Sequence, residues 1–146
     1  MGWGEVKTPM PVEKAMLLAM IAAAIDHRKN AYAPYSGFKV GAAVVGGSGK
    51  KVYFGSNVEN ASYGLSMCAE RVAILKAVSE GEREIRAVVV CAGEGEPVPP
   101  CGACLQVIAE FSPKDEPTVI VTCSADGTYT QATLADYLPM PFKMNP

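Results

Sequence analysis

Charged residues are scarce in this chain of 146 residues. They make up 19% of the sequence, and 13 Lys and Arg nearly balance 15 Asp and Glu, for a net charge of −2 without any basic run. Proteins that bind DNA or RNA usually gather positive charge, because phosphate contacts supply most of the non-specific affinity. A fold can bring scattered cations to one face, but the charge balance disfavours a nucleic-acid partner.

Long apolar runs and targeting segments are also lacking. The longest apolar run, residues 15–25, has about half the roughly 20 residues that a membrane span needs. Residues 1–8 lack the basic-then-apolar pattern of a signal peptide. Five cysteines are an odd number, which does not suit a complete set of disulfides. We therefore expect a cytoplasmic protein with reduced thiols and no membrane partner.

The length and the apolar content predict one folded domain over residues 1–146. The sequence is 49% hydrophobic, which argues against disorder, and a chain of this length can bury a core without disulfides. No internal repeat, low-complexity tract or linker divides it.

Helical and strand patterns alternate along the chain and predict an α/β fold, with a mixed sheet covered on both faces. Helices are expected over residues 12–28, 68–80 and 102–111, with a short one capped by Thr133, and strands over 38–45, 51–55, 85–92, 118–123 and 128–131. The first helix, opened by Pro9 and Pro11, is apolar around nearly its whole circumference, so it should be buried on more than one side, by the core or by a subunit interface. His27, the only histidine, should face solvent at the end of this helix.

Two cysteine-containing stretches begin the second and third expected helices. They read Cys68-Ala69-Glu70-Arg71 and Pro100-Cys101-Gly102-Ala103-Cys104. Three thiols suit a catalytic zinc ion, which keeps three protein ligands and leaves its fourth position to water. A structural four-thiolate site would need Cys91 or Cys123, but both lie in strand patterns typical of the core. We therefore expect one zinc ion per chain, held by the cysteines at helix N-termini, where thiolates are stabilised.

The two residues after Ala69 complete this pattern. Three thiolates leave a zinc ion with a net negative charge, which weakens it as a Lewis acid, and Arg71 can compensate by donating hydrogen bonds to the sulfurs. Glu70 can carry protons to and from a reacting group beside the metal, as a base in one step and as an acid in the next.

The sequence resembles the cytidine deaminases. The resemblance rests on the two cysteine stretches and on Tyr32-Ala33-Pro34-Tyr35-Ser36-Gly37-Phe38-Lys39-Val40-Gly41-Ala42-Ala43, Asn57-Val58-Glu59-Asn60-Ala61-Ser62-Tyr63-Gly64 and Tyr137-Leu138-Pro139-Met140-Pro141-Phe142. It implies a three-layer α/β/α sandwich with a mixed five-stranded sheet. It also implies hydrolytic deamination of cytidine and deoxycytidine to uridine and deoxyuridine, with release of ammonia, in pyrimidine salvage. The resemblance is to the family members that have three cysteine ligands, and it implies a homotetramer with shared active sites.

The resemblance also implies the roles of the site residues. Glu70 would take a proton from the attacking water, deliver it to N3 of the pyrimidine and assist the departure of ammonia. The remaining substrate-binding residues would be Asn57 and Glu59 at the ribose hydroxyls, Phe38 and Ala69 against the nucleoside, Phe142 on the base bound by a neighbouring subunit, and Tyr63 in a loop that contacts the next subunit's ribose. For Phe38, plain core packing is an equal alternative.

One position departs from the family. Leu105 stands where the family usually has Arg, so the charge compensation of zinc would rest more on Arg71. Three other functions stay open: a deaminase of a modified cytosine nucleoside or nucleoside antibiotic, a polynucleotide deaminase, and a non-catalytic zinc-stabilised binding module with a four-ligand site.

Overall fold

A five-stranded sheet forms the centre of the protein in a computed structural model, which describes residues 12–49 and 51–145. The strand order is β2-β1-β3-β4-β5. β3 and β4 are parallel, and the other neighbours are antiparallel. The strands are β1 (Gly41–Gly46), β2 (Val52–Ser56), β3 (Ile85–Cys91), β4 (Val119–Cys123) and β5 (Tyr129–Thr133). The predicted mixed sheet of five strands is confirmed.

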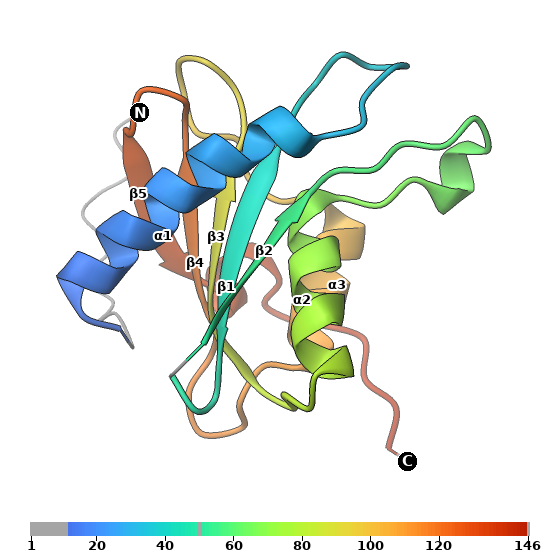
Figure 1. Cartoon of the computed structure of the whole chain (residues 1–146). Helices are drawn as coiled ribbons and strands as arrows, with labels where there is room; N and C mark the ends of the chain where they lie inside the picture. The colour runs from blue at the N-terminus through green and yellow to red at the C-terminus, as the bar shows by residue number, and fades with distance from the viewer. Residues whose placement is uncertain (1–11, 50, 146) are drawn as a thin grey trace.

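Helices cover both faces of this sheet, which makes the predicted three layers (Figure 1). α1 (Lys14–His27) packs on one face against side chains such as Ala43, Val45 and Val89. α2 (Ala69–Ser79), α3 (Gly102–Glu110) and the short α4 (Leu134–Tyr137) pack on the other face. Two 3₁₀ turns complete the set, η1 (Arg28–Asn30) and η2 (Tyr63–Leu65). No helix in the described ranges is long and apolar enough to cross a membrane.

The first strand begins later than the sequence predicted. The expected strand over 38–45 starts at Gly41, because the backbone of Val40 is occupied by Asn57: its N–H donates to Asn57 Oδ1 (2.8 Å) and its carbonyl accepts from Asn57 N–H (3.3 Å). At Gly41 the sheet and α1 come into close contact. A Cβ there would lie 3.0 Å from Arg28 N and closer to Ala24 O, so this position needs glycine.

The first helix was expected to be buried on more than one side, by the core or by a subunit interface, and in the single chain the core covers one side of it. Leu17 and Met20 are buried, but Leu18 is 48% exposed, and Ala15 and Ala22 on the same side are exposed too. The helix is therefore buried along one side only. Its predicted opening by Pro9 and Pro11, and the signal-peptide pattern sought in residues 1–8, lie outside the described residues.

His27 does not face solvent freely either. It is half-buried, and its ring stacks on Phe54 with the ring centroids 5.8 Å apart. Burial, followed by the charge of Lys76, lowers the pKa of His27.

The site-bearing segments meet at one end of the sheet. β2 and β3 end there, β1 begins there, and α2 and α3 start there. Segments 31–40 and 57–67 project from this end side by side, joined by a bridge between Tyr32 and Val58 (Figure 1).

Candidate active site

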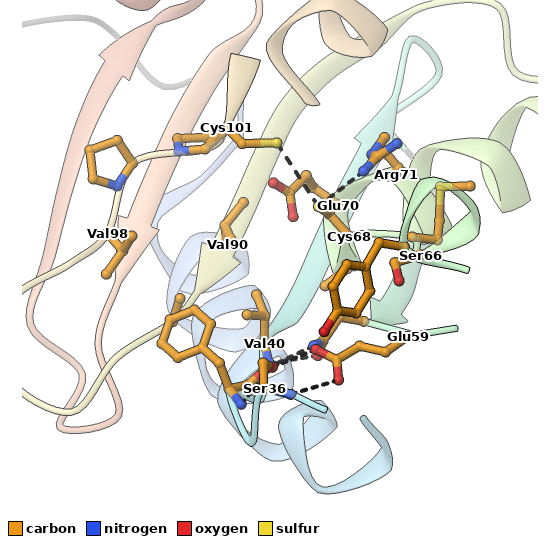
Figure 2. Close-up of a pocket in the computed structure, with 18 residues that line it drawn as sticks. Ser36, Val40, Glu59, Ser66, Cys68, Glu70, Arg71, Val90, Val98 and Cys101 are labelled. Carbon is orange, nitrogen blue, oxygen red and sulfur yellow. Dashed lines mark hydrogen bonds between the residues drawn. The ribbon is translucent and has the colours of Figure 1, made fainter. Parts of the chain in front are cut away.

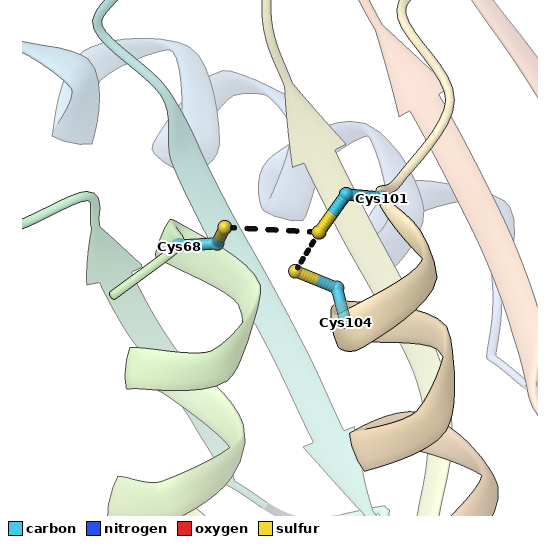
Figure 3. A group of neighbouring side chains, drawn as sticks. All are labelled: Cys68, Cys101 and Cys104. Carbon is cyan, nitrogen blue, oxygen red and sulfur yellow. Dashed lines mark hydrogen bonds between the residues drawn. The ribbon is translucent and has the colours of Figure 1, made fainter. Parts of the chain in front are cut away.

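Three cysteine thiols converge at the N-termini of α2 and α3 (Figure 3). Cys68 and Cys101 are the N-cap residues of α2 and α3, and Cys104 lies in the first turn of α3. The Sγ atoms of Cys101 and Cys104 are 3.2 Å apart, those of Cys68 and Cys101 are 4.0 Å apart, and all three lie within 4.8 Å of one another. With Zn–S bonds of about 2.3 Å, sulfurs of a tetrahedral site lie about 3.8 Å apart. The donor set therefore fits a zinc ion.

The surroundings of Cys68 favour its thiolate, the form that binds metal. A hydrogen bond with Cys104 is the main cause that lowers the pKa of Cys68 to about 5. Burial acts in the opposite direction, and the hydrogen bond and charge of Arg71 lower the pKa further. The same pairing and burial raise the pKa of Cys104. The thiolate of Cys68 is thus favoured, and a cation at the centre of the cluster would stabilise the others.

Cys91 and Cys123 do not contribute to this cluster. Both are fully buried and pack on the face of the sheet that α1 covers, where the Cys123 thiol contacts the Val90 carbonyl at 3.5 Å. Within residues 12–49 and 51–145 the metal-binding group contains three cysteines. A four-thiolate site is therefore not formed.

The Glu70 carboxyl is buried beside the thiols. Its residue is only 3% exposed, it lies in the first turn of α2, and it lines the cavity described below. Burial raises the pKa of Glu70 above the usual value for glutamate. A carboxyl group with a raised pKa holds a proton more readily than an ordinary glutamate and can return it in a later step.

Arg71 and Glu70 lie on opposite sides of Cys68 (Figure 2). One guanidinium N–H₂ donates to Cys68 Sγ at 3.2 Å. Its Nε is buried, and no acceptor for it is found among the described residues. The side chain places positive charge against a proposed zinc ligand.

Leu105 follows Cys104 but faces another environment. It is 7% exposed and belongs to the core cluster beneath α2 and α3. Leu105 brings no cation to the cysteine cluster, and among the described residues Arg71 donates a hydrogen bond to one of its thiols.

A cavity of about 430 Å³ opens above the cysteines. Five residues predicted to bind substrate line it. These five are Phe38, Asn57, Glu59, Tyr63 and Ala69. In Figure 2, Ser36 and Glu59 lie on one side of the cavity, and Cys68 and Cys101 lie on the other. Tyr63 is 76% exposed and makes an edge contact with Tyr35, with the ring centroids 6.2 Å apart. The cavity therefore brings together segments that are far apart in the sequence.

Phe142 is not among the described residues that line this cavity. It is 70% exposed, and its carbonyl accepts a hydrogen bond from Gln106 Nε2 at 2.9 Å. The structure thus separates Phe142 from the site of its own chain.

The side chains of Asn57 and Glu59 are already engaged within the protein. Asn57 donates to the Phe38 carbonyl and accepts from Val40 N–H, both at 2.8 Å. Glu59 accepts from Tyr35 N–H at 3.0 Å, from Ser36 N–H at 3.1 Å and from the Ser36 hydroxyl. Their i, i+2 spacing points both toward one side, as predicted, but that side holds the 35–40 segment as well as the cavity.

Sequence reasoning missed several residues of the cavity wall. They are Ser36, Val40, Ser66, Met67, Val90, Ala92, Val98, Pro99 and Pro100. Most are small or apolar and carry no chemical signature, so only the folding of distant segments brings them to the site. For Ser36 the sequence holds one clue, a serine directly before a glycine, which is typical of a turn. The structure has a turn there, with Gly37 at a φ of 70°.

Comparison with known proteins agrees with this geometry. Residues 15–122 match the family of the cytidine and deoxycytidylate deaminase zinc-binding region. A cytidine deaminase of Halalkalibacterium halodurans is 48% identical over 123 residues, which cover 84% of this chain and 91% of that protein. The crystal structure of a Burkholderia pseudomallei cytidine deaminase superposes with a TM-score of 0.78 at 44% identity, over 85% of this chain and 97% of the other.

A cytidine deaminase from Mycobacterium tuberculosis gives a TM-score of 0.74 at 33% identity and covers 91% of this chain and 99% of the other. The residues matched by the family, 15–122, contain the three cysteines of the cluster. Sequence and structure together establish that this chain belongs to the cytidine and deoxycytidylate deaminase family, a family with a zinc-binding region.

Proposed function

We propose that this protein is a zinc-dependent hydrolase that converts cytidine and deoxycytidine to uridine and deoxyuridine, with release of ammonia, as a step of pyrimidine salvage. The observation that carries the proposal is the cluster of three convergent thiols, two of which, from Cys68 and Cys101, line a cavity of about 430 Å³ together with the buried Glu70. This volume lies within the range of small-molecule sites. The family membership and the cytidine deaminases among its relatives support the choice of substrate.

In the proposed mechanism, Cys68, Cys101 and Cys104 would hold the zinc ion, which would supply the Lewis acidity that makes water a nucleophile near neutral pH. Glu70 takes a proton from the attacking water and gives it to N3 of the pyrimidine as the C4–O bond forms. Glu70 then takes the proton of the new C4 hydroxyl and carries it to the amino group, so that the C4–N bond breaks, ammonia leaves and the C4 carbonyl forms. The raised pKa of Glu70 suits a group that must accept and release protons in turn.

Arg71 is proposed to adjust the charge of the metal site. Its hydrogen bond to Cys68 withdraws electron density from a thiolate that would otherwise weaken the Lewis acid. With Leu105 in the core, this compensation comes from a single contacting cation among the described residues.

The sugar and the base would be held by different walls of the cavity. Asn57 and Glu59 would bind the ribose hydroxyls, while Phe38 and Ala69 would contact the nucleoside. Phe38 is 45% exposed in the free chain, which favours a substrate-facing role over plain core packing. Tyr63 lines the cavity of its own chain, and its large exposed area also leaves it free for a neighbouring subunit.

We propose a cytoplasmic homotetramer with shared active sites. Two exposed apolar surfaces support it: the outer side of α1 around Leu18, and the C-terminal segment with Met140 at 89% and Phe142 at 70% exposed. Such surfaces are typical of interfaces. Because Phe142 lies outside the cavity of its own chain, a neighbouring cavity is its proposed place.

An ultraviolet and ammonia assay tests this function. The zinc-loaded protein would be offered cytidine, deoxycytidine, cytosine, 5-substituted cytidines, adenosine and single-stranded DNA. We expect turnover of the first two, with one ammonia per uridine or deoxyuridine formed, loss of turnover after chelation and recovery with zinc. A protein with one zinc per chain that turns over neither nucleoside would refute the proposal, and turnover of only 5-substituted cytidines or only DNA would replace it with one of the alternative deaminases.

A further inference from the structure

Segment 35–40 forms one wall of the cavity, and Val40, at its end, is the residue of this segment that packs against the core. Tyr35 is 49% exposed, Phe38 is 45% exposed, and Ser36 and Gly37 between them are exposed as well. A Cβ at Gly37 would have no neighbour within 4 Å. The conformation of this wall therefore depends mainly on its hydrogen bonds.

The Ser36 side chain is the centre of these hydrogen bonds (Figure 2). Its hydroxyl donates to Glu59 Oε2, and its oxygen accepts from Phe38 N–H at 3.0 Å. A serine hydroxyl has one proton to donate, so this donor is fully used. One hydroxyl thereby links the carboxylate proposed to bind the sugar with the residue proposed to pack against the nucleoside.

Ser36 also determines which lone pairs of Glu59 stay available. A carboxylate offers about four acceptor sites. Tyr35 N–H, Ser36 N–H and the Ser36 hydroxyl occupy three of them. The remaining site can accept one hydroxyl group of a bound sugar without breaking any of these bonds.

We propose that Ser36 is a positioning residue for substrate binding, which holds the Glu59 carboxylate and the Phe38 backbone in one fixed arrangement. The inference rests on the proposed function, because it assumes that the ligand is a nucleoside with its sugar. Ser36 touches neither the thiols nor Glu70 in this arrangement, so its contribution belongs to binding and not to proton transfer. It acts through Glu59 and Phe38 and has no chemical step of its own.

The test compares Ser36→Ala and Ser36→Thr in the zinc-loaded protein, with cytidine as the probe. We expect Ser36→Ala to raise KM by about tenfold or more, the loss typical of one hydrogen bond to a charged group, and to change kcat by less than about threefold. Ser36→Thr should recover most of the loss, because threonine keeps the hydroxyl and the exposed position has room for a methyl group. Ser79→Ala is the matched control: the Ser79 hydroxyl bonds the Lys76 carbonyl at the end of α2, away from the cavity, and its KM should not change.

A double-mutant cycle separates positioning from direct contact with the sugar. In a Glu59→Ala background, Ser36→Ala should add less than about threefold to the loss in kcat/KM, because the two residues act as a unit. An undiminished effect of Ser36→Ala in that background would overturn the proposal, as would an unchanged KM in the single variant or a fall in kcat with loss of zinc.

A readout without turnover distinguishes this proposal from the proposed function. Hydrogen exchange of the Phe38 amide should accelerate by about tenfold or more in Ser36→Ala and return toward wild type in Ser36→Thr. Unchanged exchange would overturn the positioning role. A wild-type protein that is inert toward cytidine would refute the proposed function instead, whatever the exchange shows.

Discussion

Replacing Gly55 by alanine should weaken zinc binding without touching any proposed ligand. Gly55 lies in β2, where the first turn of α2 packs directly on the sheet. A Cβ at this position would be 2.7 Å from Ala73 N and closer to Ala69 O, whereas ordinary contact begins at 3.4 Å. To restore an ordinary contact of 3.4 Å from 2.7 Å, α2 and β2 must separate by about 0.7 Å, because the obstacle is helix backbone and cannot rotate away.

That movement should displace the proposed ligand on α2 from those on α3. Cys68 is the N-cap of α2, while Cys101 and Cys104 belong to α3, which Gly55 does not meet at this point. Metal–ligand distances tolerate about 0.2 Å, so a shift of about 0.7 Å should lower zinc affinity by about tenfold or more. Overpacking should also destabilise the fold by about 1–3 kcal/mol and lower Tm by roughly 2–10 °C.

Competition with a chromophoric chelator would measure the zinc affinity, and calorimetry of the metal-free protein would measure Tm. Gly95→Ala is the matched control, because an added Cβ there has no neighbour within 4 Å, and it should change neither quantity. Alanine is normally favoured over glycine inside a strand by roughly 0.5–1 kcal/mol. A Gly55→Ala protein as stable as wild type, with the same zinc affinity, would therefore refute the close packing of α2 on β2.

Three further outcomes are expected. Arg71→Ala should lower zinc affinity by about 10–100-fold in chelator competition, because Cys68 loses a donor that stabilises its thiolate, and an unchanged affinity would contradict that role. Deleting the chain from Phe142 onward should raise KM for cytidine at constant zinc content, and an active monomer in light scattering would be incompatible with a shared site. Hydrogen bonds from the Ser36 side chain and backbone lower the pKa of Glu59, so its contribution to loop stability is complete above the unfolded glutamate pKa and is lost as pH falls through the lower folded value. Phe38 amide exchange, corrected for intrinsic rates, should show this loss in acid, and Glu59→Gln should remove the dependence.

The cysteine cluster could be predicted from the sequence because its signal is local. Cys101 and Cys104 are three residues apart at a helix start, which places both sulfurs on one side of a turn, and Cys68 begins the other helix. Because the two helices alternate with strands along the chain, both helices start at the same end of the sheet. Few other arrangements of these elements would satisfy the connection rules of α/β folds.

The 35–40 wall could not be predicted in this way. Residues 38–40 have the composition of a strand, but Asn57 binds the Phe38 carbonyl and the Val40 amide and so takes the place of a strand neighbour. Nothing in the local pattern shows that an amide 17 residues away will do this. The same reason explains why the sequence did not predict the three hydrogen bonds by which Glu59 holds the loop.

The surface of α1 marks another limit of the sequence. An apolar circumference shows that a helix should be covered, but it does not identify what covers it. In the single chain the sheet covers the side with Leu17 and Met20 and leaves Leu18 exposed. The proposed homotetramer would cover the other side, but no local pattern in the sequence identifies that partner.

Turnover by a Glu70→Gln variant with one zinc per chain tests the central claim most directly. Glutamine keeps nearly the same shape but carries no exchangeable acid proton, so zinc content and Tm should remain those of wild type. The account predicts that kcat for cytidine falls by at least about a hundredfold, the contribution typical of general acid–base catalysis. A zinc-loaded Glu70→Gln protein that releases ammonia from cytidine at a near-native rate would contradict it.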